Sequence, residues 1–129
     1  MKTQMRELYR CEVCGNVVEV VNTGMTMLVC CNKPMVKLEA KKEDVGVEKH
    51  LPVIEDFGGK IKVKIGSVEH PMEEKHYIVF VEVLTDKKVL RHEFKPGEKP
   101  EAIFDVSLSD VKEVREFCNI HMLWAKEVK

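Results

Sequence analysis

Hydrophobic and polar residues alternate through most of the chain with a period of two, which is typical of strands that bury one face. The clearest case is the alternation of Ile61, Val63 and Ile65 with lysines. The same criteria predict further strands at 51–54, 77–84, 89–94 and 102–106, with turns at 57–59, 85–88 and 96–100. Only 110–117 has a weak helical spacing, which a loop or short turn would fit equally well. Short strands between frequent turns predict an antiparallel β-sandwich.

The first 37 residues follow a different pattern, in which short apolar runs are broken by turns at 11–15 and 22–24. A segment this small cannot bury enough apolar surface to hold a fold by itself. It carries four cysteines that could staple it, and the charged stretch 41–44 follows it as a linker or solvated edge. We therefore expect two domains, at 1–37 and 38–129.

Composition and charge exclude several classes of protein. The 129 residues are 44% hydrophobic and 33% charged, a mixture typical of a soluble chain with a core. The 21 basic and 22 acidic side chains give a formal net charge of -1, which argues against nucleic acid as a partner. No apolar run approaches the roughly 20 residues that cross a bilayer. The polar N-terminus has no visible secretory leader, so we expect a cytoplasmic protein without a membrane partner.

Four of the five cysteines form a metal-binding signature, Cys11-x-x-Cys14 with Cys30-Cys31. An odd number of cysteines, two of them adjacent, fits poorly with a disulfide framework. Gly15 permits the left-handed backbone that such a metal-binding turn often needs. Because adjacent side chains diverge, Cys30 and Cys31 can reach one metal only through a strained turn. Four thiolates suit zinc or iron, and the spacing leaves the two equally open.

The remaining cysteine and most of the histidines suggest a second metal site. Each lies at the end of an expected strand or in the loop beyond it, where a rigid sandwich can hold convergent ligands. Taken singly, each histidine is better explained as a solvated loop residue. Together they favour a metal site formed by His50, His70, His76, Cys118 and His121.

One histidine is left out of this second site, and the ligands of the site also suit another metal. His92 lies within an expected strand among charged neighbours and is interpreted as an outward-facing residue. Cys118-x-x-His121 followed by Met122, with one upstream histidine, would also suit a blue-copper centre. That alternative leaves at least two of the loop histidines without a role.

These motifs, together with Glu48-Lys49-His50 and the sequence HPMEEKHY over 70–77, resemble desulfoferrodoxin, the two-iron superoxide reductase family. The resemblance covers essentially the whole chain in order. It implies a mostly β protein, with a small desulforedoxin-like head followed by an immunoglobulin-like antiparallel β-sandwich. The head would carry an Fe(Cys)4 centre at Cys11, Cys14, Cys30 and Cys31. The sandwich would carry an Fe(His)4Cys centre, with His50, His70, His76 and His121 equatorial and Cys118 axial.

The resemblance also implies an activity, the one-electron reduction of superoxide to hydrogen peroxide. In the family, the glutamate matching Glu48 binds the open iron position once iron is ferric, and the lysine matching Lys49 attracts superoxide and organises water. Such electrostatic attraction is expected to weaken with salt. A reduced rubredoxin-like protein would donate electrons, and the chain would form a homodimer through its heads.

Two other classes of function stay open on the residues alone. One is a blue-copper-type electron carrier with a structural zinc head. The other is a zinc-stapled interaction module whose histidines are ordinary loop residues. Metal content and superoxide kinetics would separate these from the superoxide reductase.

Overall fold

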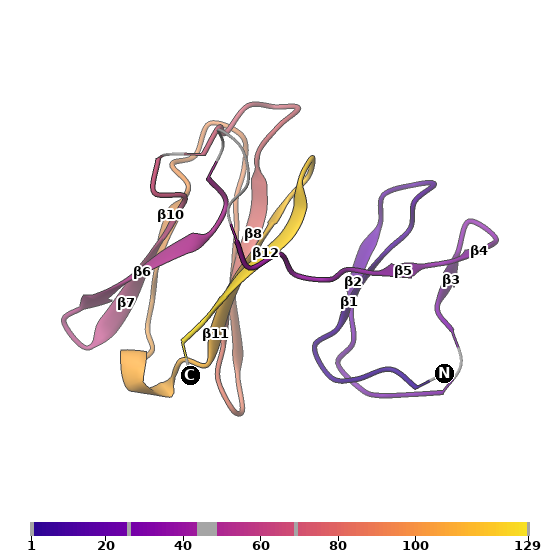
Figure 1. Cartoon of the computed structure of the whole chain (residues 1–129), viewed down its shortest axis with the longest axis horizontal. Helices are drawn as coiled ribbons and strands as arrows, with labels where there is room; N and C mark the ends of the chain where they lie inside the picture. Colours follow the sequence, from indigo (N-terminus) through magenta and orange to yellow (C-terminus); the bar gives the residue numbers. More distant parts are fainter. Residues whose placement is uncertain (1, 26, 44–48, 69, 129) are drawn as a thin grey trace. The chain divides into compact units, whose positions relative to one another are not determined.

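The computed structural model describes residues 2–25, 27–43, 49–68 and 70–128. The chain divides into two compact units, Met1–Glu39 and Ala40–Lys129, and Figure 1 labels most of their strands. The division falls two residues after the boundary expected at 37/38. Regular structure in the described residues is almost all β, with a single short 3-10 helix at Leu108–Asp110.

The first unit is a small set of short antiparallel strands. Three of them form a sheet in the order β2-β1-β5, and the other two form a separate hairpin, β3-β4. Their bounds are β1 Leu8–Arg10, β2 Val17–Glu19, β3 Val29–Cys30, β4 Lys33–Pro34 and β5 Val36–Lys37. Among its described residues only Thr3, Leu8, Tyr9, Cys11 and Val20 are buried. So small an interior supplies little hydrophobic stabilisation.

The second unit is a sandwich of two antiparallel sheets. A three-stranded sheet has the order β10-β7-β6 and a four-stranded sheet the order β12-β11-β8-β9. The bounds are β6 Pro52–Phe57, β7 Lys60–Ile65, β8 Ile78–Leu84, β9 Val89–Glu93, β10 Glu101–Phe104, β11 Glu113–Cys118 and β12 Met122–Glu127. Both sheets contribute to one apolar core, for example through Val63 of β7 and Val81 of β8. The expected sandwich and its strands between 51 and 106 are thus confirmed.

The C-terminal part differs from the expectation. The weak helical spacing at 110–117 was misleading, because Glu113–Cys118 is strand β11, and β12 after it was not expected. The pattern misleads because β11 buries polar side chains as well as apolar ones. Arg115 and Glu116 are both buried, and Arg115 Nη2 lies 2.7 Å from Glu82 Oε1. Buried ion pairs of this kind hide the two-residue period.

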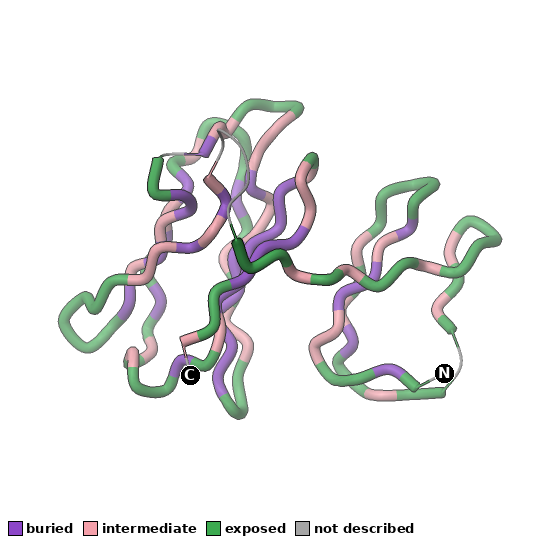
Figure 2. Tube along the Cα trace, viewed as in Figure 1, coloured by how far each residue is buried: buried purple, intermediate pink, exposed green. Residues whose placement is uncertain are grey.

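Figure 2 shows the buried residues concentrated along the strands of the second unit, while exposed residues dominate the turns of the first. The sandwich therefore has the packed interior that can hold loops rigidly at its ends. In the described part of the chain, no helix has the length and apolar character needed to cross a membrane.

Two candidate metal sites

All four cysteines of the first unit converge. One sulfur from each of Cys11, Cys14, Cys30 and Cys31 lies within 4.8 Å of the others. The Cys14 and Cys30 sulfurs are 3.5 Å apart, and the Cys14 backbone N–H donates to Cys11 Sγ at 3.5 Å. Asn16 Nδ2 donates to Cys30 Sγ at 3.8 Å. Four sulfurs this close, with N–H donors directed at two of them, fit a tetrahedral zinc or iron ion.

Unusual backbone conformations bring these sulfurs together. Gly15 has φ +85°, the left-handed conformation expected after the Cys11–Cys14 turn. Cys31 and Asn32 also have positive φ, 53° and 61°. This is the strained turn that lets adjacent cysteines face one centre, and non-glycine residues adopt it only at a cost.

Hydrogen bonds within the cluster shift the pKa values of three of its thiols. The Cys14 backbone N–H is the main cause that lowers the pKa of Cys11 to about 6. Hydrogen bonding with Cys14, and then with Cys11, raises the pKa of Cys31 to about 12. The pKa of Cys30 is also raised, chiefly by Cys14. Such a cluster favours a bound cation, because metal binding converts competing thiols into thiolate ligands.

The second site collects ligands from three loops at the edge of the sandwich. His50 lies two residues before β6, Cys118 ends β11, and His121 lies in the β11–β12 turn. His70 and His76 lie in the connection from β7 to β8. Two groups of ligand atoms lie within 4.8 Å of one another, and they share the thiol: His50, His70 and Cys118, and His76, Cys118 and His121.

The four imidazoles form a closed ring around this shared thiol. Successive ring centroids are 4.6 Å apart for His50–His70, 5.1 Å for His70–His76, 5.2 Å for His76–His121 and 4.9 Å for His121–His50. The interplanar angles along this circuit lie between 59° and 84°, so neighbouring rings are tilted rather than stacked. Four neutral nitrogen donors and one thiolate form a mixed ligand set suited to iron or copper.

Burial varies in a consistent direction across the ring. Cys118 is completely buried and belongs to the sandwich core, and His50 and His70 are each only 2% exposed. His76 and His121 are half-buried. This gradient indicates that solvent reaches the site from the side of His76 and His121, away from the core.

Surrounding groups orient the rings. His70 Nδ1 lies 2.7 Å from the Pro71 carbonyl, so Nε2 is the nitrogen that can ligate a metal. His50 Nδ1 lies 3.6 Å from a carboxylate oxygen of Glu116, which is fully buried. A carboxylate behind a ligating imidazole is a recurrent device that fixes ring orientation and raises ligand basicity.

Sequence reasoning missed three of the residues that shape this site. Glu116 lies two residues before Cys118, on the same face of β11, and that spacing was its only signal. Asn119 accepts the Tyr77 N–H at 3.0 Å and donates to the Lys75 carbonyl at 3.1 Å. It therefore holds the backbone on both sides of His76. Trp124, the third, stacks on His50.

The other expected residues have separate outcomes. Lys49 is half-buried and directly precedes His50, whereas Glu48 lies outside the described residues. His92 belongs to neither metal group; its Nε2 lies 3.0 Å from Glu98 Oε2 on the surface. Its interpretation as a strand residue with no metal role agrees with this position.

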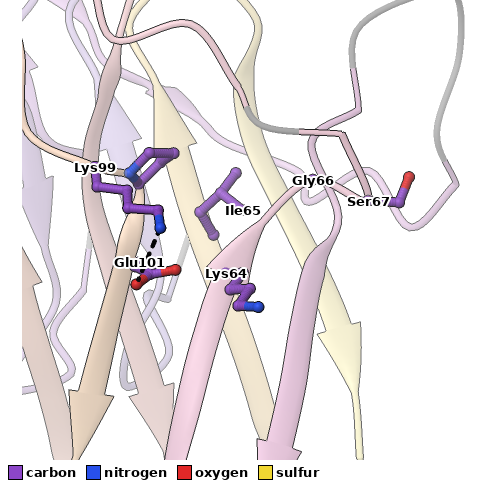
Figure 3. A pocket seen from close by; sticks show the side chains of 7 residues that line it. Lys64, Ile65, Gly66, Ser67, Lys99 and Glu101 are labelled. Carbon is purple, nitrogen blue, oxygen red and sulfur yellow. Dashed lines mark ion pairs between the residues drawn. The ribbon is translucent and has the colours of Figure 1, made fainter.

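The second unit also has a pocket with a different lining. Figure 3 shows it at the end of β7, where Lys99 and Glu101 form an ion pair of 3.8 Å. Its lining residues are Lys64, Ile65, Gly66, Ser67, Lys99, Pro100 and Glu101. This set shares no residue with the metal sites, so the pocket is not part of them.

A thiolate cluster on a small β unit, followed by an imidazole–thiolate cluster on a β-sandwich, defines a two-site metal-binding protein. Comparison with known families gives this class a name. Residues 3–38 match the family model described as the desulfoferrodoxin N-terminal domain, and residues 40–127 match that of desulfoferrodoxin. The chain belongs to the desulfoferrodoxin family, as the sequence motifs predicted.

Individual relatives agree with this assignment. A desulfoferrodoxin homolog of Archaeoglobus fulgidus is 53% identical over 95% of this chain and 97% of its own length. One from Methanothermobacter thermautotrophicus is 51% identical over 95% and 98%, respectively. The crystal structure of the superoxide reductase from Treponema pallidum superposes with a TM-score of 0.76 and 29% identity, covering 94% of this chain and 97% of that one. The desulforedoxin-like head and the β-sandwich are therefore both present in the expected order.

Proposed function

We propose that this protein is a superoxide reductase that converts superoxide to hydrogen peroxide at an iron centre in the sandwich. The proposed ligands are His50, His70, His76, Cys118 and His121. The observation that supports this most directly is the closed ring of four imidazoles around one shared, buried thiol. A solved structure that covers nearly the whole chain is that of a superoxide reductase.

The donor set favours iron over the blue-copper alternative. Blue-copper centres use two histidines and one cysteine with a weak axial ligand. Here four imidazoles lie around Cys118, so a copper centre of that type would leave two of them idle. When bound, ferrous iron supplies the one electron that reduces superoxide, and with two protons this electron balances superoxide to hydrogen peroxide.

The protein's contribution is to hold the ligands and admit a small anion. Cys118 belongs to the core, and its thiolate would donate electron density to a bound metal. A metal held by these five ligands would keep a coordination position for a small anion. The burial gradient supports an approach from the solvent side, near His76 and His121.

We assign the charged residues before His50 to substrate and product handling. Lys49 places a cation beside the site, and a cation at the mouth of a partly desolvated site raises the local concentration of an anion. It also organises the water that delivers the two protons. Glu48, on the family resemblance alone, would serve as a ligand that helps product leave the iron after turnover.

The first unit is proposed to hold a second iron on Cys11, Cys14, Cys30 and Cys31. Its ligands Cys14 and Cys31 are exposed, so a small reduced redox protein such as rubredoxin could approach them closely. All five cysteines are thiols, which supports a reducing cytoplasm as the working compartment.

A homodimer formed through the heads is also proposed. The head has a groove whose lining includes large apolar side chains that are more than a third exposed: Val18, Val21, Met25, Met27 and Val29. Burying this surface against a second head would give the small unit the hydrophobic stabilisation that it lacks alone.

The activity is tested by replacing one ligand and one histidine that is not a ligand. Iron-loaded, anaerobically reduced protein is mixed with superoxide, and the rate of superoxide loss is followed for His76→Ala and His92→Ala. His76→Ala should lose the fast reaction by at least about 10²-fold, because removing a ligand disrupts the centre. His92→Ala should react as the parent protein does. Equal rates for His76→Ala and the parent would refute the assigned site.

A further inference from the structure

We infer that Trp124 is a positioning residue of the catalytic centre, whose indole holds two adjacent imidazoles of the ring at once. This inference rests on the metal site proposed above. Trp124 is the single tryptophan of the chain, lies in β12 and is only 3% exposed. It is itself no metal ligand, because indole offers only an N–H donor.

The first contact is with His50. The indole and imidazole rings are nearly parallel, with centroids 4.5 Å apart and an interplanar angle of 11°. Stacked rings of this kind favour a narrow range of orientations. On another side of His50, Glu116 approaches Nδ1, and Glu116 is also the residue paired with Trp124 across the β11–β12 ladder. His50 is therefore confined by two neighbouring strand residues.

The second contact is with His121. Trp124 Nε1 donates a 2.9 Å hydrogen bond to the His121 carbonyl, which fixes the β11–β12 turn that carries this imidazole. His50 and His121 lie far apart in sequence, yet their ring centroids are only 4.9 Å apart. One rigid side chain with two torsions thus sets the relative position of two ligands from separate loops.

Lys41 completes this arrangement from the outside. Its Nζ lies 4.9 Å from the indole centroid and 3.5 Å from the His121 carbonyl. Its backbone is held by hydrogen bonds on either side of Trp124, from Lys41 N to Leu123 O and from Ala125 N to Lys41 O. The cation–π contact favours the same indole position that the stacking and the hydrogen bond require.

Two substitutions separate the contacts. Trp124→Phe keeps an aromatic ring for His50 but loses the N–H that holds His121, and Trp124→Leu removes both contacts. Phe104→Leu is the control, because Phe104 is a buried aromatic of the opposite sheet and belongs to the apolar core of the sandwich. It should weaken packing without altering the ligands' orientation.

The test measures ferrous-iron affinity on the full-length protein. One equivalent of zinc is added first to fill the thiolate cluster, which prefers it, and ferrous iron is then titrated in competition with a chelator. Trp124→Leu should lose about 10–100-fold in affinity, Trp124→Phe should fall between it and the parent, and Phe104→Leu should bind as the parent does. The thiolate-to-iron absorption of the oxidised centre should shift in the same order.

The inference is overturned if Trp124→Phe keeps the parent's affinity and absorption, or if Phe104→Leu loses as much affinity as Trp124→Leu. If Trp124→Leu fails to fold, the comparison of ferrous-iron affinity between Trp124→Phe and Phe104→Leu tests the inference alone. The readout is metal binding, not turnover. A parent protein that binds iron but does not reduce superoxide would refute the proposed function while leaving this inference standing.

Discussion

The two metal sites of this protein are built in opposite ways. In the head, two of the four thiols are exposed, and all four belong to a unit with few buried residues. In the sandwich, a thiol and two imidazoles are almost fully buried at the edge of a core formed by two sheets. We therefore expect the head to depend on a bound metal for its structure, and the sandwich to have enough structure of its own to impose geometry on a bound metal. On this interpretation, the metal of the head serves stability and the metal of the sandwich serves chemistry.

Removal of metal should produce the largest difference between the head and the sandwich. After chelation under reducing conditions, backbone amides of the head should exchange with solvent as in an unfolded chain, because the free energy of metal binding is its folding free energy. Amides of β8 and β11 should stay protected by the core. Hydrogen exchange on the full chain, before chelation and after metal is restored, measures both. A head that keeps its protection without metal would show that its own packing suffices.

A single glycine offers the next largest effect, because it lies between two loops that carry ligands. Gly66 has φ +84°, and a Cβ there would lie 2.5 Å from the Lys49 carbonyl oxygen and would also clash with that of Val68. Gly59 has the same φ of +84°, but nothing lies within 4 Å of its Cβ position. The positive φ should cost each alanine variant about 1–2 kcal/mol.

Only Gly66→Ala should also displace the loops that carry His50 and His70, because both obstacles are backbone atoms. Thermal unfolding and iron affinity, measured on both variants, separate the two costs. Gly66→Ala should lose more stability than Gly59→Ala and should also lose iron affinity. Equal behaviour of the two variants would mean that the loops move aside without consequence for the site.

A substitution at Lys49 tests the proposed catalytic role of the sandwich site. Lys49→Met should slow the reaction with superoxide by about tenfold at low ionic strength and flatten its salt dependence, because the steering charge is lost. Lys99→Met removes the same charge from the rim of the pocket in Figure 3 and should change neither property. Stopped-flow rates over a series of salt concentrations test this, and an unchanged slope for Lys49→Met would rule out steering.

The smallest effect belongs to the histidine outside the metal sites. Hydrogen bonding to His92 is the main cause that lowers the pKa of Glu98. A lowered carboxyl pKa stabilises the fold above the unfolded-state pKa, and this contribution is lost as the pH falls through the folded-state value. His92→Ala should therefore lose slightly less stability than the parent between neutral and acidic pH. Because both side chains are about 40% exposed, the difference should stay under about 1 kcal/mol; chemical denaturation at the two pH values measures it.

The sequence predicted the candidate ligands, which the structure brings together, and the sandwich strands up to residue 106, since both leave a direct trace in spacing and alternation. Cys11-x-x-Cys14 and the alternation around Val63 are local signals. The groups behind the ligands leave no such trace. Glu116 looks like a surface charge until β11 is seen to be buried, and Trp124 contacts His50 only after two strands have paired. Contacts of this kind depend on tertiary packing, which periodicity does not encode.

The central claim is that the imidazole–thiolate site reduces superoxide, and the yield of hydrogen peroxide tests it most directly. Fully reduced, iron-loaded protein is mixed anaerobically with less than one equivalent of superoxide, and the peroxide formed is measured. A reductase yields one peroxide for each superoxide consumed and releases no oxygen. A yield of one peroxide for every two superoxides, with oxygen released, would show dismutation and contradict the claim; so would a peroxide yield no higher than that of the same buffer without protein.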